Sequence, residues 1–562
     1  MGNIFGIMDI GAKALRAQQL ALEVTSHNIA NADTPGYTKQ TAVLETTTPV
    51  SAGPAGFSGT GVDVAAIQRA YDKFTNAQIN LENEAYGSAQ GKHDLLQSVE
   101  RVFNESSTAG VANAMSEFFS AWQGLSANPA GSLERQAVLA RGDQLASAFQ
   151  SAYRSLLQAH GDGDQAIAGT VDEINRLASD IAALNQDIHD MEGGGSGAAN
   201  DLRDRRDYLL TQLSNKVGVT TFEADNGMVT VTLAGGPVLI ESARANTLTP
   251  DVENGRQVIN FSGSGGMIEM TGILKTGALG GMISARDDHI QAYMDALGDL
   301  AGAVAVEVNK THLAGYGLDG STNTLFFEAP AAVTGADSAN TGGAAIGSGT
   351  VTDPAQLTAD DYEIRFTAPA SYDVVNITTG AAVVTGEAYS SGTAIATVPG
   401  ISFAISDGGS GPAAGDRFTV SMDKDQFASV MAVSSAVAGS PEKIAAAEDD
   451  PLLVSGAGDN RNALAVAGLA SSLTVAGGST SPLEFYAALV SRVGQDVDQA
   501  GREAAFGKAS LAELENLRDA ISGVSIDEEM VNLIKFQNAY AAGARLIKVG
   551  TDLLDILVNL GR

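Results

Sequence analysis

The sequence predicts an α+β multidomain protein with a terminal α-helical coiled coil, a rod domain built as a bundle of long helices, and inserted β-rich outer domains. Three observations carry this prediction: a length of 562 residues, apolar residues at helical spacing at both ends of the chain, and alternating apolar and polar residues in its middle. At about 150 residues per domain, the length allows roughly three or four domains. The chain is therefore long enough to bury several hydrophobic cores.

A first helix is expected over residues 4–31, because apolar residues recur there every three or four positions. They form two neighbouring stripes. A helix with two such stripes has more apolar surface than a single partner helix can cover. The stripes consist of Ile10, Ala14, Ala17, Ala21 and Val24, and of Met8, Leu15, Leu22 and Ile29.

A last helix, starting at residue 526, repeats this design. Two interpretations fit: two helices inside one bundle, or a terminal coiled coil whose outer stripe is buried only against neighbouring subunits. Charge favours the second. Residues 1–38 carry two basic and three acidic groups and residues 524–562 carry four and five, so 31 of the 33 net negative charges lie between them. We therefore assign residues 1–38 and 524–562 to an inner coiled-coil domain.

Between the ends, further apolar stripes predict a helical rod domain made of residues 39–218, 278–329 and 424–523. One of its helices stops at the helix breaker Gly193-Gly194-Gly195-Ser196-Gly197. The helices expected in this domain cover residues 74–102, 111–125, 167–191, 202–217 and 279–310.

In two stretches the spacing of apolar residues changes to the alternation that is typical of a β-strand. Residues 219–277 form a small β-rich segment with a strand over 228–233. Residues 330–423 are expected to form a β-rich outer domain, because Tyr362, Ile364 and Phe366 point to one face of a strand. The chain would thus leave the helical rod and return to it.

Composition excludes several functional classes. A formal charge of −33, from 66 acidic and 33 basic residues, disfavours binding to nucleic acids and to anionic membranes. The sequence has no cysteine, which excludes disulfides, thiol catalysis and cysteine-ligated metals. We find no apolar run long enough for membrane insertion. The amino terminus also lacks the basic segment of a cleaved signal peptide, so export would need another route.

Motifs for catalysis and ligand binding are weak, and we predict no enzyme activity, no catalytic residue, no cofactor and no metal. Residues 315–320 fit a dinucleotide-binding pattern, but no strand precedes them, so a plain turn is expected. Asp162, Asp164 and Glu173 match three positions of a calcium-binding loop, but the position-5 ligand and the position-6 glycine are missing. A solvated loop is expected there instead.

The first helix is followed by a strong turn signal in the decapeptide Asn-Ile-Ala-Asn-Ala-Asp-Thr-Pro-Gly-Tyr, residues 28–37. Pro35 biases Thr34 out of the helical region and Gly36 permits a sharp turn, so the chain must swing away here. The decapeptide closely resembles the signature of bacterial flagellar axial proteins, the family of rod, hook and hook-associated subunits.

A second motif opens the last helix. Ser525 or Asp527 can cap this helix, and the acidic triplet Asp527-Glu528-Glu529 suits the positive end of its dipole. The segment from Ser522 onward is similar to the closing motif of hook-associated members of the family. The resemblance covers nearly the whole chain and is looser between about residues 330 and 480.

The resemblance implies a structural subunit of the extracellular flagellum that forms the hook–filament junction and is required for filament assembly. It implies self-association in a ring or helical layer, and contacts with the hook subunit and with a second hook-associated protein. It also implies a flagellar export chaperone at the C-terminal helices and type III export without a cleaved signal peptide. Assembly is expected to depend on Ile10, Leu15, Leu22, Asn28, Ile29, Asn31, Thr34, Pro35, Gly36, Tyr37, Asp527, Glu528, Glu529, Leu533, Phe536, Gln537, Tyr540, Ile547, Leu554 and Leu557.

Three alternatives stay open at this point. The nearest is another flagellar axial protein such as the hook subunit. The second is a secreted β-rich adhesin-like protein that binds through residues 330–423. The third is a secreted hydrolase using acidic pairs such as Asp360-Asp361, although chance pairs are expected among 66 carboxylates.

Overall fold

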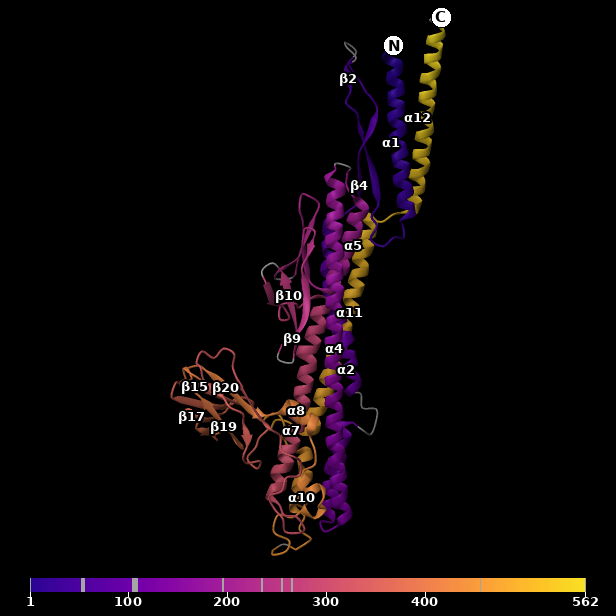
Figure 1. The fold of residues 1–562 in the computed structure, drawn as a ribbon. Helices are drawn as coiled ribbons and strands as arrows, with labels where there is room; N and C mark the ends of the chain where they lie inside the picture. The colour runs from indigo at the N-terminus through magenta and orange to yellow at the C-terminus, as the bar shows by residue number, and fades with distance from the viewer. Residues whose placement is uncertain are drawn as a thin grey trace. The chain divides into compact units, whose positions relative to one another are not determined.

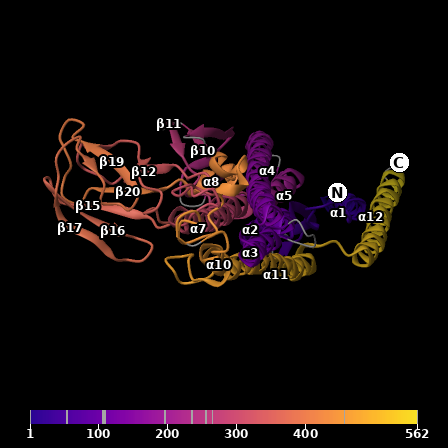
Figure 2. The same cartoon turned by 90° about the horizontal axis from the view of Figure 1, so that it is seen from below.

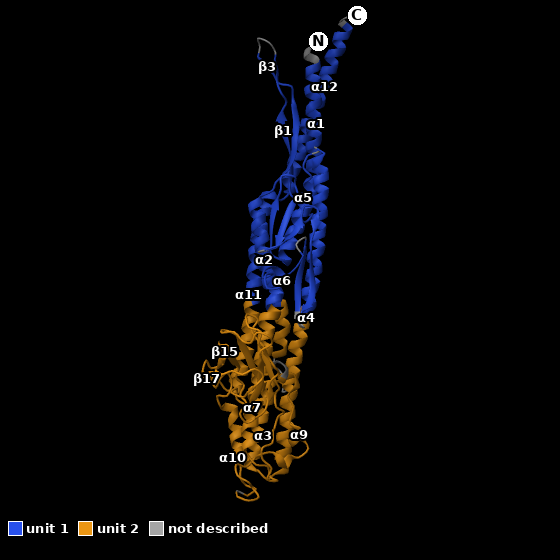
Figure 3. Cartoon of the chain, turned by 60° about the vertical axis from the view of Figure 1, so that its left-hand side comes forward, with its two compact units in different colours: residues 1–93, 164–284, 500–562 blue, residues 94–163, 285–499 orange. Residues whose placement is uncertain are grey.

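A computed structural model describes residues 2–51, 56–103, 110–194, 197–233, 236–253, 256–263, 266–454 and 456–560. It divides the chain into two compact units, blue and orange in Figure 3. Unit 1 combines residues 1–93, 164–284 and 500–562, and unit 2 combines residues 94–163 and 285–499. Residues 195 and 196 of the expected helix breaker lie outside the described residues. The finer division into inner, rod and outer domains stays a prediction.

Unit 1 contains the helices expected at both ends of the chain. The first helix, α1, spans Gly2–Ala30 and the last, α12, spans Ile526–Leu560, as their apolar stripes predict (Figure 1). Helix α5, Asn200–Lys216, confirms the helix expected over residues 202–217. The other long or short helices that lie wholly or partly in this unit are α2 (Lys73–Phe103), α4 (Ser132–Gly193), α6 (Gly277–Ser284) and α11 (Pro482–Ser522).

The strands of unit 1 form small antiparallel sheets. β1 pairs with β4, β2 with β3, and two further sheets have the orders β5-β6-β7-β8 and β11-β10-β9. Side chains of these last two sheets, such as Val231 and Phe261, share one core with Ile174 and Ile181 of α4. The strands are β1 (Gln40–Thr46), β2 (Val50–Ser51), β3 (Phe57–Ser58), β4 (Val62–Arg69), β5 (Val219–Glu223), β6 (Val229–Leu233), β7 (Val238–Glu241), β8 (Arg244–Ala245), β9 (Thr247–Glu253), β10 (Arg256–Gly263) and β11 (Gly266–Glu269).

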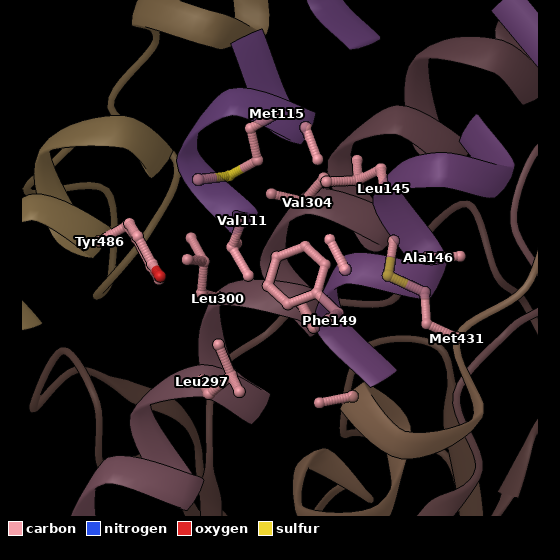
Figure 4. Close-up of a cluster of buried hydrophobic side chains, with 14 of the residues drawn as sticks. Val111, Met115, Leu145, Ala146, Phe149, Leu297, Leu300, Val304, Met431 and Tyr486 are labelled. Carbon is pink, nitrogen blue, oxygen red and sulfur yellow. The ribbon is translucent and has the colours of Figure 1, made fainter. Parts of the chain in front are cut away.

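The helical part of unit 2 surrounds an apolar core (Figure 4). Val111 and Met115 come from α3, Phe149 from α4, and Leu297 and Leu300 from α7, and all are buried. The chain's one tryptophan, Trp122, belongs to the same core. The helices here are α3 (Val111–Ala127), the π-helix Ala285–Ile290, α7 (Gln291–Ala314), α8 (Lys424–Val430), α9 (Ser435–Ala438) and α10 (Arg461–Gly468), with 3-10 turns at Pro441–Lys443 and Leu469–Ser471.

The expected strands between residues 330 and 423 form two sheets in unit 2 (Figure 2). One has the order β12-β20-β15-β16-β17, and in the other β13, β14 and β18 all pair with β19. Tyr362, Ile364 and Phe366 are buried in a core that both sheets share, as their alternation predicts. The strands are β12 (Ala332–Ala336), β13 (Ala345–Ile346), β14 (Thr350–Val351), β15 (Tyr362–Ala368), β16 (Ser371–Asn376), β17 (Ala382–Ala388), β18 (Ala394–Ile395), β19 (Ile401–Ser406) and β20 (Arg417–Met422).

One expectation from the sequence needs correction. The supposed solvated loop at Asp162, Asp164 and Glu173 is wrong, because α4 runs unbroken through these residues. Gly163 interrupts the sequence pattern for a packing reason: a Cβ there would lie 3.0 Å from Cδ2 of Leu95 on α2. The helix expected over residues 279–310 is confirmed, and it contains a π-helix between α6 and α7.

Candidate functional site: a polar junction at the base of the terminal helices

The terminal helices α1 and α12 pack against each other in opposite directions. Met8 lies against Gly550 and Leu15 lies against Gly543. Residue numbers thus increase along α1 in the direction in which they decrease along α12, so the two helices are antiparallel. A Cβ on Gly11 would lie only 2.8 Å from Cγ1 of Ile547. Glycine therefore permits the close approach of the two helices.

Apolar side chains remain exposed on the far side of this helix pair. Of the predicted assembly residues, Ile10, Leu15, Leu22 and Ile29 on α1 and Leu533, Phe536, Ile547 and Leu554 on α12 are partly buried, whereas Gln537, Tyr540 and Leu557 are exposed. We call the exposed apolar face of α12 the outer strip. It consists of Val531, Ile534, Leu546, Val549, Leu553, Ile556 and Leu557.

The chain turns sharply after α1, as the decapeptide predicts. Gly36 has a φ of +80°, a conformation that favours glycine. Tyr208 of α5 packs closely on Gly36 and leaves no room for a side chain there, since a Cβ would lie 2.8 Å from the Cβ of Tyr208. The hydroxyl of Thr34 donates a hydrogen bond to Oδ1 of Asn31 at 3.1 Å, while Pro35 and Tyr37 complete the loop.

Asn28 is the centre of the contacts between this loop and α12. Its amide nitrogen donates to the carbonyl of Gln40 at 2.8 Å and to Oε2 of Glu529 at 3.0 Å. Its Oδ1 accepts from the hydroxyl of Tyr37 at 2.7 Å and from the backbone nitrogen of Gln40 at 3.0 Å. All four hydrogen-bonding positions of this buried amide are therefore used, and they join residues about 500 positions apart.

Glu529 is only 2% exposed, although glutamate is rarely buried without a partner. Its second oxygen lies 3.5 Å from Nζ of Lys39, which also contacts Glu528 at 2.9 Å. The hydrogen bond to Glu528 raises the pKa of Lys39 more than burial lowers it. The backbone nitrogen of Glu528 donates to the hydroxyl of Ser525, which caps α12. Asp527 is exposed in the first turn.

A second set of contacts joins the loop to α5. The backbone nitrogen and hydroxyl of Thr38 each donate to Asp204 at 2.8 Å, and Nη1 of Arg69 lies 2.7 Å from the same carboxylate. Arg69 also contacts Asp207 at 2.8 Å and stacks over the ring of Tyr71 at 4.1 Å. Burial raises the pKa of Asp204, and its hydrogen bonds with Arg69 and Thr38 act in the opposite direction.

We call this set the polar junction, and it consists of Asn28, Tyr37, Thr38, Lys39, Gln40, Arg69, Asp204 and Glu529. The sequence motifs predicted Asn28, Tyr37 and Glu529, and the structure brings these three together. Sequence reasoning missed Asp204 as a site residue, because it lies in the charged run Asp201–Asp207, which is typical of a solvated helix face. Nothing in the local sequence marks Asp204, whose side chain is buried in the structure.

The contacts of the polar junction fix the positions of α1, α5 and α12 relative to one another. Within the described ranges, no three histidine or acidic side chains gather closely enough to hold a metal ion. Among those same residues, no helix has the length and apolar character needed to cross a bilayer.

Comparisons with known proteins point to one family. The family described as "Flagellar hook-associated protein FlgK helical domain" matches residues 96–327. Families described as "Flagella basal body rod protein" and "Flagellar basal body rod FlgEFG protein C-terminal" match residues 8–38 and 519–560, the segments that form the α1–α12 pair and its junction.

The relatives match along almost their full length. The chain is 30% identical over 559 residues to flagellar hook-associated protein 1 of Escherichia coli (strain K12), covering 97% of this chain and 98% of that protein. It is 28% identical over 568 residues to the protein of the same name from Bacillus subtilis (strain 168), covering 100% and 99%. The solved structure of the flagellar hook junction protein FlgK from Burkholderia pseudomallei has a similar fold, with a TM-score of 0.65 and 22% identity over 79% of this chain and 100% of that chain. The chain belongs to the flagellar hook-associated protein 1 family.

Proposed function

We propose that this protein is a structural subunit of the bacterial flagellum that forms the hook–filament junction, adapts hook to filament and is required for filament assembly. Family membership supports the location, and the outer strip of α12 supports the assembly role. An exposed apolar strip of this length calls for a partner, because monomeric proteins rarely expose large contiguous apolar surfaces.

The outer strip would be buried against neighbouring subunits in a ring or helical layer. At roughly 25 cal/mol per Å² of apolar surface, burial along two long helices would contribute on the order of 10 kcal/mol or more before ordering costs. The polar junction would hold the α1–α12 pair at a fixed place on α5 while that burial takes place. In this role its residues Asn28, Asp204 and Glu529 position the assembling surface and perform no chemistry.

The partners follow from the same surface. The hook subunit would contact the assembled layer on one side and a second hook-associated protein on the other. Before assembly, an export chaperone would cover the apolar C-terminal helix, and the chain would leave the cell through the flagellar type III apparatus without cleavage. We propose no enzymatic activity.

The test is a truncation in a strain that lacks this protein. A chain without residues 540–562 loses most of the outer strip, so we expect hooks without filaments and flagellin released into the medium, seen by electron microscopy and immunoblotting. Normally attached filaments would refute the proposal. Loss of the hooks themselves would indicate a hook subunit instead.

A matched control removes the outer strands. The backbone nitrogen of Asp423 donates to the carbonyl of Ala331 at 2.7 Å, so the two ends of this insert are adjacent. Replacing residues 332–422 by a short Gly-Ser linker is therefore compatible with the helical part of unit 2. We expect this variant to attach filaments, since the proposed assembly surface is intact.

A further inference from the structure

A cavity of about 220 Å³ lies in unit 1 between the loop after α1, helix α5 and the end of α11. Its wall contains four carboxylates and three tyrosines, and we call it the acidic pocket. These seven residues are Asp204, Asp207, Glu515, Asp519, Tyr37, Tyr71 and Tyr208.

The charges of the acidic pocket do not balance. Arg69 contacts both Asp204 and Asp207, and Arg518 contacts Asp519 at 2.8 Å. These two arginines therefore pair with three of the four carboxylates. Glu515 makes no ion pair with any residue that the structure describes. The pocket is thus electronegative and would attract a cation and repel an anion.

Ser522 is a second, independent observation at the acidic pocket. It lines the acidic pocket, it is only 3% exposed, and its hydroxyl has no hydrogen-bond partner in the described part of the chain. Buried hydroxyls are normally paired, so this one is available to a ligand that carries N–H groups. A guanidinium fits best, because it combines several donors, charge complementarity to carboxylates and favourable contact with tyrosine rings.

The structure offers such a group on the exposed side of α12. Lys535, Arg545 and Lys548 are exposed there, and none of them makes an ion pair within the described residues. Arg545 also borders a shallow groove of about 410 Å³ whose floor includes Ala541 and Ala542. Small side chains leave room for a ring, and Tyr208 is 39% exposed at the acidic pocket.

The same chain cannot supply this arginine to its own pocket. Arg545 lies 19 residues beyond the start of α12 at Ile526, and a helix rises about 1.5 Å per residue, which places Arg545 roughly 28 Å along the helix. The start of α12 follows Ser522 of the pocket after only a short linker. Arg545 could therefore reach the acidic pocket only from a second copy.

We propose that the acidic pocket takes the guanidinium of Arg545 from a second copy of this chain, with Tyr208 seated in the α12 groove of that copy. This rests on the proposed function, since the two copies meet in the assembled layer. The pocket would then fix how neighbouring copies are placed, and the outer strip would supply most of the attraction.

The absence of native cysteine makes a direct test possible. Two copies with different tags, one carrying Glu515→Cys and the other Arg545→Cys, are expressed together in a strain lacking the protein, and isolated flagella are treated with a short bismaleimide. This reagent replaces the length of the two long side chains, which hold the backbones further apart than a disulfide can span. We expect a cross-linked pair with both tags. Ala520→Cys replaces Glu515→Cys in the control, because five residues of helix turn this exposed position about 140° away from the pocket.

Equal cross-linking in the control, or none with Glu515→Cys in flagella that carry filaments, would overturn this inference and leave the proposed function intact. A charge exchange covers the case in which the cysteine variants do not assemble. Glu515→Arg and Arg545→Glu should each reduce filament attachment several-fold, and the double variant should restore it. Failure of the double variant to improve on either single variant would also overturn the inference. Failure of the proposed function would be seen in a different experiment, as filaments attached normally in the strain that carries the chain without residues 540–562.

Discussion

Helix α3 in unit 2 and helix α12 in unit 1 carry similar apolar stripes. The side chains of α3 are buried within the chain, whereas many of those of α12 are exposed. Along α3, the side chains of Val111, Met115, Phe118 and Trp122 are all buried within the chain. Along α12, residues such as Val549 stay about half exposed, at 52% for this side chain. Periodicity thus indicates that a helix needs a partner, but it does not tell whether the partner is in the same molecule.

The largest test of this comparison removes one aromatic ring from the unit 2 core. Phe118→Ala should lower the free energy of unfolding by about 3–5 kcal/mol, because it leaves a cavity among Trp122, Phe326 and Phe327. Trp122 fluorescence during urea unfolding measures this. Val549→Ala should change the stability of the monomer by no more than about 0.5 kcal/mol. Equal losses would mean that the outer strip is already covered within one chain.

A pH titration of protein stability tests the buried core of unit 2, which contains His312. Burial of His312 lowers its pKa from 6.5 to about 4. Its Nδ1 donates to the carbonyl of Thr324, and its Nε2 accepts from the backbone of Ala445, so the neutral ring fits the site. The stability that the neutral ring contributes is present above pH 6.5. It is lost as the pH falls towards 4, by about 3 kcal/mol.

The matched variant for this titration is His312→Gln. Glutamine can both donate and accept but does not titrate, so its stability curve should be flatter between pH 6.5 and 4 by the amount that His312 contributes. Parallel curves for the two proteins, measured through the neighbouring Trp122, would contradict the assignment.

The polar junction should respond to the loss of its buried carboxylate but not of the exposed one beside it. Glu529→Ala leaves one buried N–H of the Asn28 amide without its acceptor and removes one of the two carboxylates that contact Lys39, so α12 should open more easily by about 1–3 kcal/mol. Glu528→Ala removes a contact exposed to solvent and should cost about 0.5 kcal/mol or less. Hydrogen exchange in the first turns of α12 distinguishes the two, and similar exchange in both variants would argue against a buried lock.

The smallest effects are expected from two glycines of α1. Gly11→Ala places a Cβ against Ile547, so the two terminal helices must separate slightly and we expect a loss of about 1 kcal/mol. Gly6→Ala meets open space and should stabilise the helix by up to about 1 kcal/mol. Circular dichroism during thermal unfolding measures both. Stabilisation by Gly11→Ala would mean that α1 and α12 are not closely packed in solution.

Much of the fold could be predicted because its signals are local. Apolar spacing indicated α1, α5 and α12, and alternation placed Tyr362, Ile364 and Phe366 on a buried strand face. The unbroken α4 could not be predicted, since the glycine that interrupts its pattern is explained only by Leu95 on another helix.

The candidate site divides in the same way. The turn at Gly36 and the cap at Ser525 follow from local chemistry and were predictable. The role of Asp204 depends on Thr38 and Arg69, which are more than 130 positions away in sequence. Nothing local separates such a buried carboxylate from its solvated neighbours in the same charged run.

The pairing of α1 with α12 also sets an order in time. At translation rates of about 5–20 residues per second, the partner of Gly11 is made roughly 25–100 s after Gly11 itself. During that interval α1 has no α12 to pack against. Pairing of the two helices also has to close a loop of about 500 residues. The helix that is synthesised last, α12, is therefore the partner of the helix that is synthesised first, α1. A chain whose synthesis stops early lacks this helix pair.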